Sequence, residues 1–90
     1  MCQIFNDHLF VKKETKGYSL YFKNELVGYN YNLYSYLDNI LIMKKDNKID
    51  IFILLSNGNL EIFNSITQKV FVLVDYKMYS IDINCTIKLL

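Results

Sequence analysis

The sequence contains no alanine, proline, tryptophan or arginine among its 90 residues. Without alanine the chain lacks the strongest helix former, whereas isoleucine, valine, tyrosine and phenylalanine, which favour strands, are abundant. Without arginine it lacks the planar guanidinium that grips a phosphate or a guanine base through two hydrogen bonds. The composition therefore favours β structure and offers little for the specific recognition of nucleic acid.

An excess of charge of one sign is also missing, because ten lysines stand against nine acids and the net charge is +1. Such a chain exerts no strong attraction on nucleic acid or on an anionic membrane. No apolar run approaches the roughly 20 residues that span a bilayer, and residues 1–20 lack the apolar core of a secretion signal. We therefore expect a soluble, cytoplasmic protein, of a cell or of a host cell, with no membrane partner.

Two cysteines, Cys2 and Cys85, fit a reducing compartment better than a disulfide scaffold. The first five residues, MCQIF, resemble the MCGIF start of the class II glutamine amidotransferases. This resemblance implies that Cys2, freed by removal of Met1, acts as a nucleophile with its own α-amino group as the base. The match departs at Gln3, where the family has glycine, and the family's layered fold needs a much longer chain. We therefore expect Cys2 to be non-catalytic.

Other catalytic and metal-binding patterns are missing from the sequence. His8 is the single histidine, and it forms no zinc-ligand spacing with the two cysteines. The segment 46–50 lacks the glycine and the terminal glutamate of a calcium loop. The three glycines are isolated, so they form no phosphate-binding loop. We predict that the protein is not an enzyme and that it needs no cofactor or metal.

Alternation of apolar and polar residues predicts most of the strands. The strongest turn is Asn57-Gly58, a two-residue loop that suits a type I′ hairpin and would pair Leu55 with Leu60. Residues 69–74 are apolar on both sides, which predicts a strand covered on both faces. Alternation also runs without a break through residues 79–89. The expected strands are 9–12, 18–23, 26–31, 40–44, 49–56, 59–63, 69–74 and 79–89.

We predict one all-β domain over residues 1–90, an antiparallel meander of about six to eight strands that forms a small barrel or a sandwich. We also predict a short helix near residues 33–38, because Leu33, Tyr36 and Leu37 fall at helical spacing. A helix that continues to Lys44 is the alternative. Two propeller-like blades of four strands are another alternative, although the sequence shows no convincing internal repeat.

Tyrosines are the best candidates for a binding surface, because their rings offer rigid, amphipathic contact area. The alternative is that the rings fill the core and keep their hydroxyl groups at its rim. The predicted binding residues are Tyr21, Tyr29, Tyr31, Tyr34 and Tyr36.

The predicted function is a non-catalytic protein-binding module that occludes a protein partner and forms a homo-oligomer. An apolar fraction of 52% is more than one small core buries easily. Small size and amino acids with AT-rich codons are compatible with a phage- or virus-encoded inhibitor of a host factor. One alternative is a single-stranded nucleic-acid binder, in which bases stack on the tyrosines beside Lys23, Lys44 and Lys45. A small-ligand-binding β-barrel is the other alternative.

Overall fold

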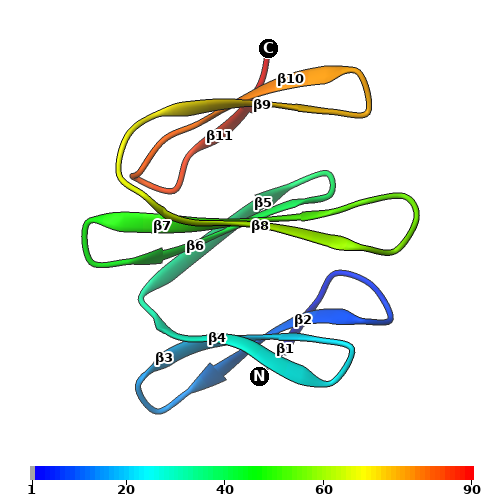
Figure 1. Cartoon of the computed structure of the whole chain (residues 1–90). Coiled ribbons are helices and arrows are strands. Elements are labelled where there is room, and N and C mark those ends of the chain that lie inside the picture. The colour runs from blue at the N-terminus through cyan, green and yellow to red at the C-terminus, as the bar shows by residue number, and fades with distance from the viewer. Residues whose placement is uncertain (1) are drawn as a thin grey trace. The chain divides into compact units, whose positions relative to one another are not determined.

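The computed structural model describes residues 2–90, and the regular structure of these residues consists of eleven strands without any helix. The strands form three antiparallel sheets, named A, B and C (Figure 1). The strand order is β1-β2-β3-β4 in sheet A, β5-β6-β7-β8 in sheet B and β11-β10-β9 in sheet C. The prediction of an all-β antiparallel meander is therefore confirmed.

Each sheet is built from consecutive strands of the chain. Sheet A contains β1 (Cys2–Ile4), β2 (Leu9–Glu14), β3 (Gly17–Phe22) and β4 (Glu25–Tyr31). Sheet B contains β5 (Leu33–Leu37), β6 (Ile40–Lys45), β7 (Lys48–Leu54) and β8 (Leu60–Ile66). Sheet C contains β9 (Val70–Val74), β10 (Lys77–Ile81) and β11 (Ile87–Leu89).

The chain divides into two compact units, Met1–Leu33 and Tyr34–Leu90. Unit 1 holds sheet A, and unit 2 holds sheets B and C. The expectation of one domain over residues 1–90 stays a prediction.

Unit 2 is a sandwich in which sheets B and C share one apolar core. Sheet B contributes the isoleucines of β6 and β7, and sheet C contributes side chains of β10 and its neighbours. Each large apolar side chain that is fully buried stabilises the fold by about 1.5–3 kcal/mol. Neither sheet closes on itself, so this unit is a sandwich and not a barrel. The core residues are Ile40, Ile42, Ile49, Ile51, Ile53, Val74, Tyr79, Ile81 and Cys85.

Sheet A, in unit 1, has one face of buried apolar side chains. Leu9, Val11 and Leu20 are at most 3% exposed, and Val11 lies opposite Leu20 on the neighbouring strand. Successive side chains of a strand point to opposite faces, so Phe10 and Tyr21 point to the other face. That second face of sheet A is partly exposed.

The expected helix near residues 33–38 is wrong, because Leu33–Leu37 forms β5 beside β6. The apolar residues of this segment fit helical spacing, but its leucines and tyrosines also suit a strand. Pairing with β6 satisfies the backbone of β5, and tertiary context of this kind overrides local periodicity. Asp38, with a φ of 52°, then turns the chain into β6.

The hairpin at Asn57-Gly58 is confirmed, but its predicted register is wrong by one residue. The structure pairs Leu54 with Leu60 instead of Leu55 with Leu60. The loop is longer than a type I′ turn, since the backbone N–H of Leu55 donates to the carbonyl of Asn59 at 2.8 Å. Only the glycine of this loop has a positive φ, 88°, as expected for a three-residue loop that ends in a glycine bulge.

The predicted continuous strand over residues 79–89 is also wrong, because it is split into β10 and β11 by a loop over residues 82–86. In this loop the N–H of Cys85 donates to the carbonyl of Asp82, and Cys85 has a φ of 72°. Ile83 and Cys85 continue the alternation of apolar and polar residues through the loop, so the sequence pattern does not indicate a turn there. This split and the additional strands β1 and β5 give eleven strands instead of six to eight.

The three sheets share a repeated unit that the sequence does not reveal. Each contains a hairpin with a two-residue loop, at residues 15–16, 46–47 and 75–76. Counting outward from these loops places Phe10, Leu41 and Val70 at equivalent positions. Such positions share apolar character but not residue identity, which explains why no repeat was expected.

A β-bulge at the same place in sheets A and B supports this equivalence. The register between β3 and β4 shifts between Tyr18 and Leu20, and the register between β7 and β8 shifts between Ile49 and Ile51. These two pairs are equivalent when counted from the loops. The extra residue lies in the last strand of each sheet, where Asn30 and Ser65 have positive φ values of 62° and 58°.

The repeat defines two faces for every sheet. Face 1 carries the residues that flank the loop at 15–16, 46–47 or 75–76, and every second residue from them along the strands. Face 2 is the opposite side of the same sheet. In unit 2, face 2 of sheet B, with Ile42 and Ile51, packs on face 1 of sheet C, with Tyr79 and Ile81. The two sheets of unit 2 therefore pack face 2 against face 1.

Candidate binding surface

The structure distributes the five predicted tyrosines between the two units. Tyr21, Tyr29 and Tyr31 belong to unit 1, and Tyr34 and Tyr36 belong to unit 2. Tyr29 and Tyr36 are 57% and 51% exposed, whereas Tyr31 is 3% exposed. Two of the five therefore present most of their ring to solvent, and one is part of a core. Their role in binding stays a prediction.

The bulge in β4 explains why Tyr29 and Tyr31 differ. A regular strand would place both rings on one face, but the extra residue at Asn30 interrupts the alternation. The ring of Tyr31 turns back over Gly28, where a Cβ atom would collide with it. Glycine at this position therefore allows the burial of Tyr31.

Tyr21 lies on face 1 of sheet A and is held by its neighbours. Its ring stacks on Phe10, with 5.0 Å between the ring centroids and 11° between the planes. Its hydroxyl group donates to Oε1 of Glu14 at 3.3 Å. Tyr21 therefore forms part of an ordered aromatic pair on a partly exposed sheet face.

Cys2 is exposed and lines a shallow depression of about 350 Å³ at the edge of sheet A. The other lining residues are Ile4, Asn6, Asp7 and Phe10, so His8 is not among them. Met1, on which the resemblance to the amidotransferases depends, lies outside the described residues. Within residues 2–90, no three His, Cys, Asp or Glu side chains gather as metal ligands would.

Face 2 of sheet C carries the largest group of exposed apolar side chains that the register places together. Leu73 lies opposite Met78, and the N–H of Leu90 donates to the carbonyl of Met78 at 2.9 Å. Phe71 follows two residues before Leu73 on β9 and points to the same face. These four residues, named the sheet C patch, are 60% (Phe71), 67% (Leu73), 41% (Met78) and 68% (Leu90) exposed.

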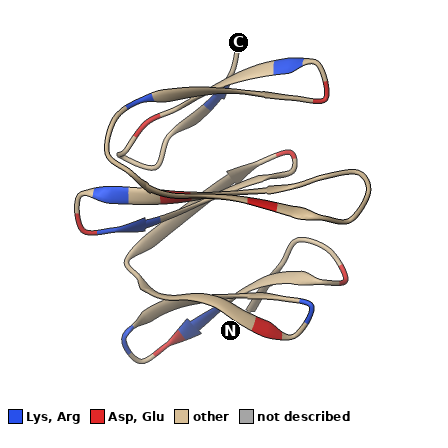
Figure 2. Cartoon of the chain, in the orientation of Figure 1, with Lys and Arg blue, Asp and Glu red and all other residues tan. Residues whose placement is uncertain are grey.

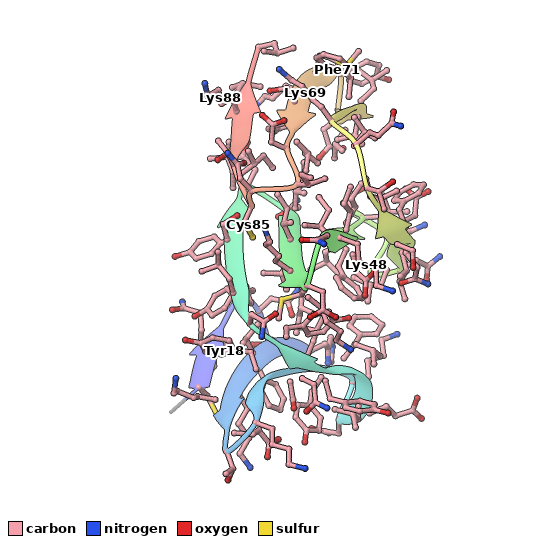
Figure 3. All side chains as sticks on the ribbon, turned by 90° about the vertical axis from the view of Figure 1, so that its left-hand side faces the viewer. Tyr18, Lys48, Lys69, Phe71, Cys85 and Lys88 are labelled. Atoms are coloured by element: carbon pink, nitrogen blue, oxygen red, sulfur yellow. The ribbon has the colours of Figure 1, made fainter. Side chains whose placement is uncertain are left out.

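Lysines border the sheet C patch. Lys69 Nζ lies 5.7 Å from the centroid of the Phe71 ring, a cation–π contact, and Figure 3 shows the two side chains close together. Lys88 lies opposite Ser80 and shares face 2 with the patch. Figure 2 shows that the charged residues beside β9 and in β10 lie toward the strand ends, so the middle of these two strands is uncharged.

Polar contacts with sheet B hold sheet C in place. The Tyr79 hydroxyl donates to Oδ2 of Asp38 at 2.5 Å. This hydrogen bond, together with burial and the nearby carboxylates, raises the pKa of Tyr79 to about 12. Ser35 Oγ donates to the carbonyl of Cys85 at 2.5 Å. These contacts fix sheet C against sheet B.

Cys85 is buried between the same two sheets (Figure 3). Its Sγ donates to the carbonyl of Ile42 at 3.6 Å, and burial raises the pKa of the Cys85 thiol. The described structure therefore contains one exposed cysteine, Cys2, and one protected cysteine.

Sequence reasoning did not identify the sheet C patch, although it recognised the apolar character of β9. A strand that is apolar on both sides predicts cover on both faces, and the structure covers only the side with Val72 and Val74. A strand that is apolar on both sides also fits a sheet with one face on the core and the other face on a partner protein, and that interpretation would have identified the patch.

No protein-family model, curated protein or solved structure matches the chain. No helix in residues 2–90 has the length and apolar character needed to cross a membrane.

Proposed function

We propose that the protein is a non-catalytic protein-binding module whose contact surface is the sheet C patch. The observation that carries this proposal is the row formed by Leu73, Met78 and Leu90 across one sheet face, with Phe71 beside it. The largest exposed apolar patch of a monomeric protein is often a functional interaction surface. The protein acts by covering the surface of its partner.

The patch favours a partner with an apolar surface and an acidic border. Burial of apolar area contributes about 25 cal/mol per Å² before the costs of association are subtracted. Lys69 and Lys88 lie beside the apolar side chains, so acidic groups on the partner would complement them and fix the orientation of binding. Sheet C is already held by its contacts with sheet B, which reduces the ordering cost of binding.

Tyrosines give weaker support to the single-stranded nucleic-acid alternative. Tyr31 is buried, and one face of the Tyr21 ring is already stacked on Phe10, so these two rings offer less surface to a base than exposed tyrosines would. The absence of arginine further limits phosphate contacts. The protein-binding proposal is therefore preferred.

A charge substitution in the patch tests this function. Leu73→Lys places an ammonium group in the middle of the patch, and Ile62→Lys makes the same change at an exposed residue of β8 as the control. We expect the affinity for a captured and then purified partner protein to fall at least about tenfold with Leu73→Lys and to stay unchanged with Ile62→Lys. Isothermal titration calorimetry measures both, and equal affinities for all three proteins would overturn the proposal.

A further inference from the structure

Two exposed sheet faces of this chain are a face 2 and a face 1, the two kinds of face that pack together in unit 2. We propose that face 2 of sheet C in one copy packs on face 1 of sheet A in a second copy, so that copies associate head to tail. This inference rests on the proposed function and identifies the partner as the same protein.

The packing inside unit 2 supplies the template for this contact. There, face 2 of sheet B covers face 1 of sheet C. Ile42 and Ile51 lie opposite each other on sheet B and are 0% and 1% exposed. Ile81 of sheet C, on the covered side, is 0% exposed. In unit 2 the repeat therefore buries face 2 of one sheet against face 1 of the other.

Sheet C has a face 2 that is not covered in this way. Counted from the hairpin loops, Phe71 is equivalent to Ile42 and Met78 is equivalent to Ile49. Both isoleucines are fully buried, whereas Phe71 and Met78 are 60% and 41% exposed. At these two positions the apolar character of a covered face is thus present in sheet C without its cover, whereas the equivalent of the buried Ile51 is Ser80.

Sheet A has the complementary face 1. Its register forms one apolar row across all four strands, in which Ile4 lies opposite Phe10, Phe10 opposite Tyr21, and Tyr21 opposite Leu26. Ile4 and Leu26 are 69% and 51% exposed. This row, named the sheet A row, ends in exposed aliphatic side chains on both outer strands.

The centre of the sheet A row corresponds to residues that are packed in sheet C. Phe10 and Tyr21 are equivalent to Val70 and Ile81, which lie in the contact with sheet B. Two of the positions that receive a face 2 inside unit 2 are therefore occupied by a stacked aromatic pair in sheet A. The equivalents of Val72, Val74 and Tyr79 in sheet A are the polar residues Lys12, Glu14 and Ser19. A second copy of sheet C offers the kind of face that these positions accept.

Charge favours this unequal contact over the pairing of two sheet C patches. Pairing two copies of face 2 of sheet C would bring Lys69 and Lys88 of both copies to one interface without an acidic residue on either face, and like charges at an interface are unfavourable. Face 1 of sheet A instead carries both signs, with Glu14 and Lys12. The contact is therefore heterologous, which generates rings or open chains of copies.

The size of the two faces predicts moderate affinity. Stable interfaces bury about 800 Å² per partner, and each of the two surfaces has only four large apolar side chains. We expect dissociation constants in the micromolar range, on the order of 1–100 µM.

A mixing experiment tests the head-to-tail contact. Leu73→Lys blocks the sheet C patch, Leu26→Lys blocks the sheet A row, and Ile62→Lys is the control. By sedimentation velocity over roughly 1–300 µM, we expect wild type and the control to associate with increasing concentration and each blocked variant alone to stay monomeric. An equimolar mixture of the two blocked variants should form a one-to-one dimer and nothing larger, because only one intact pair of faces remains.

Several outcomes would overturn this inference. A wild type that stays monomeric at every concentration excludes it. Association of Leu26→Lys alone would show that two sheet C patches pair, and failure of the mixture to dimerise would exclude a heterologous contact. Circular dichroism confirms that both variants are folded, and Leu26→Gln with Leu73→Gln repeats the mixture if either lysine variant unfolds.

The same measurements separate this inference from the proposed function. A monomeric wild type that binds another protein through Leu73 would overturn the self-association and retain the protein-binding function. A monomeric wild type whose binding to other proteins is unaffected by Leu73→Lys would overturn both.

Discussion

Face 2 of sheet B and face 2 of sheet C occupy equivalent positions in the repeat, yet one is buried and the other is exposed. Ile42 is 0% exposed beneath sheet C, whereas its equivalent, Phe71, is 60% exposed. Both positions are apolar, so residue type does not explain the difference. What differs is that a neighbouring sheet covers sheet B on this side. The comparison teaches that an apolar position of the repeat is buried only where a neighbouring sheet covers it.

Truncation of a covered residue should have the largest effect. Ile42→Ala removes buried methyl and methylene groups and leaves a cavity between sheets B and C, so we expect the free energy of unfolding to fall by about 2–5 kcal/mol. Urea denaturation followed by circular dichroism measures this change, with Ile62→Ala as an exposed control. A loss below about 1 kcal/mol would show that the two sheets do not pack tightly at this position.

Thiol labelling tests the same covered contact without a mutation. Cys85 is buried and burial raises the pKa of its thiol, so both access and thiolate formation are reduced. Cys2 is exposed. We expect Cys85 to react with a maleimide at least about a hundredfold more slowly than Cys2, because it reacts only when the sheets open. Mass spectrometry of digested protein measures both rates, and similar rates would contradict a closed contact.

The hydrogen bond from Tyr79 to Asp38 predicts a pH dependence for this contact. The pKa of Tyr79 rises from 10.0 to about 12 in the folded protein, chiefly because its hydroxyl donates to the Asp38 carboxylate. A raised pKa means that folding favours the neutral hydroxyl. The stabilisation is therefore complete below pH 10 and is lost as the pH rises through about 12.

The variant Tyr79→Phe isolates that contribution. We expect a lower midpoint of thermal unfolding than in wild type at pH 8, and a difference between the two proteins that shrinks as the pH rises from 10 to 12. Differential scanning calorimetry across this range measures the difference. A constant difference would show that the hydroxyl group does not titrate with the unfolding equilibrium.

The sequence predicted the strands well where a pattern of period two was joined to a clear turn. The hairpin at Asn57-Gly58 was located, but its register was missed because loop length depends on which residues adopt positive φ. The break over residues 82–86 and the bulge at Asn30 place non-glycine residues in the left-handed region, which local composition does not indicate. Such positions are set by tertiary contacts, so single-residue preferences cannot locate them.

The candidate site was harder to predict than the fold. Alternation in β9 identified Phe71 and Leu73 as one apolar side of a strand, but it could not tell whether a sheet covered that side. Tyrosines are predicted binding residues because their rings offer a large contact area, and the buried Tyr31 shows that the same property suits a core. Exposure depends on neighbours that are distant in sequence, which explains why the patch emerged only from the structure.

Truncation of an exposed residue should have the smallest effect and completes the comparison with Ile42→Ala. Phe71→Ala removes a larger side chain at the equivalent position, yet we expect the unfolding free energy of the dilute monomer to change by less than about 0.5 kcal/mol, because the ring is mostly in solvent. At higher concentration, self-association would raise the unfolding midpoint of wild type by mass action, and Phe71→Ala should weaken that increase. Thermal unfolding followed at several concentrations measures both effects. A loss above about 2 kcal/mol in the dilute variant would mean that this face is already covered within one copy, and the contrast between the two sheets would then disappear.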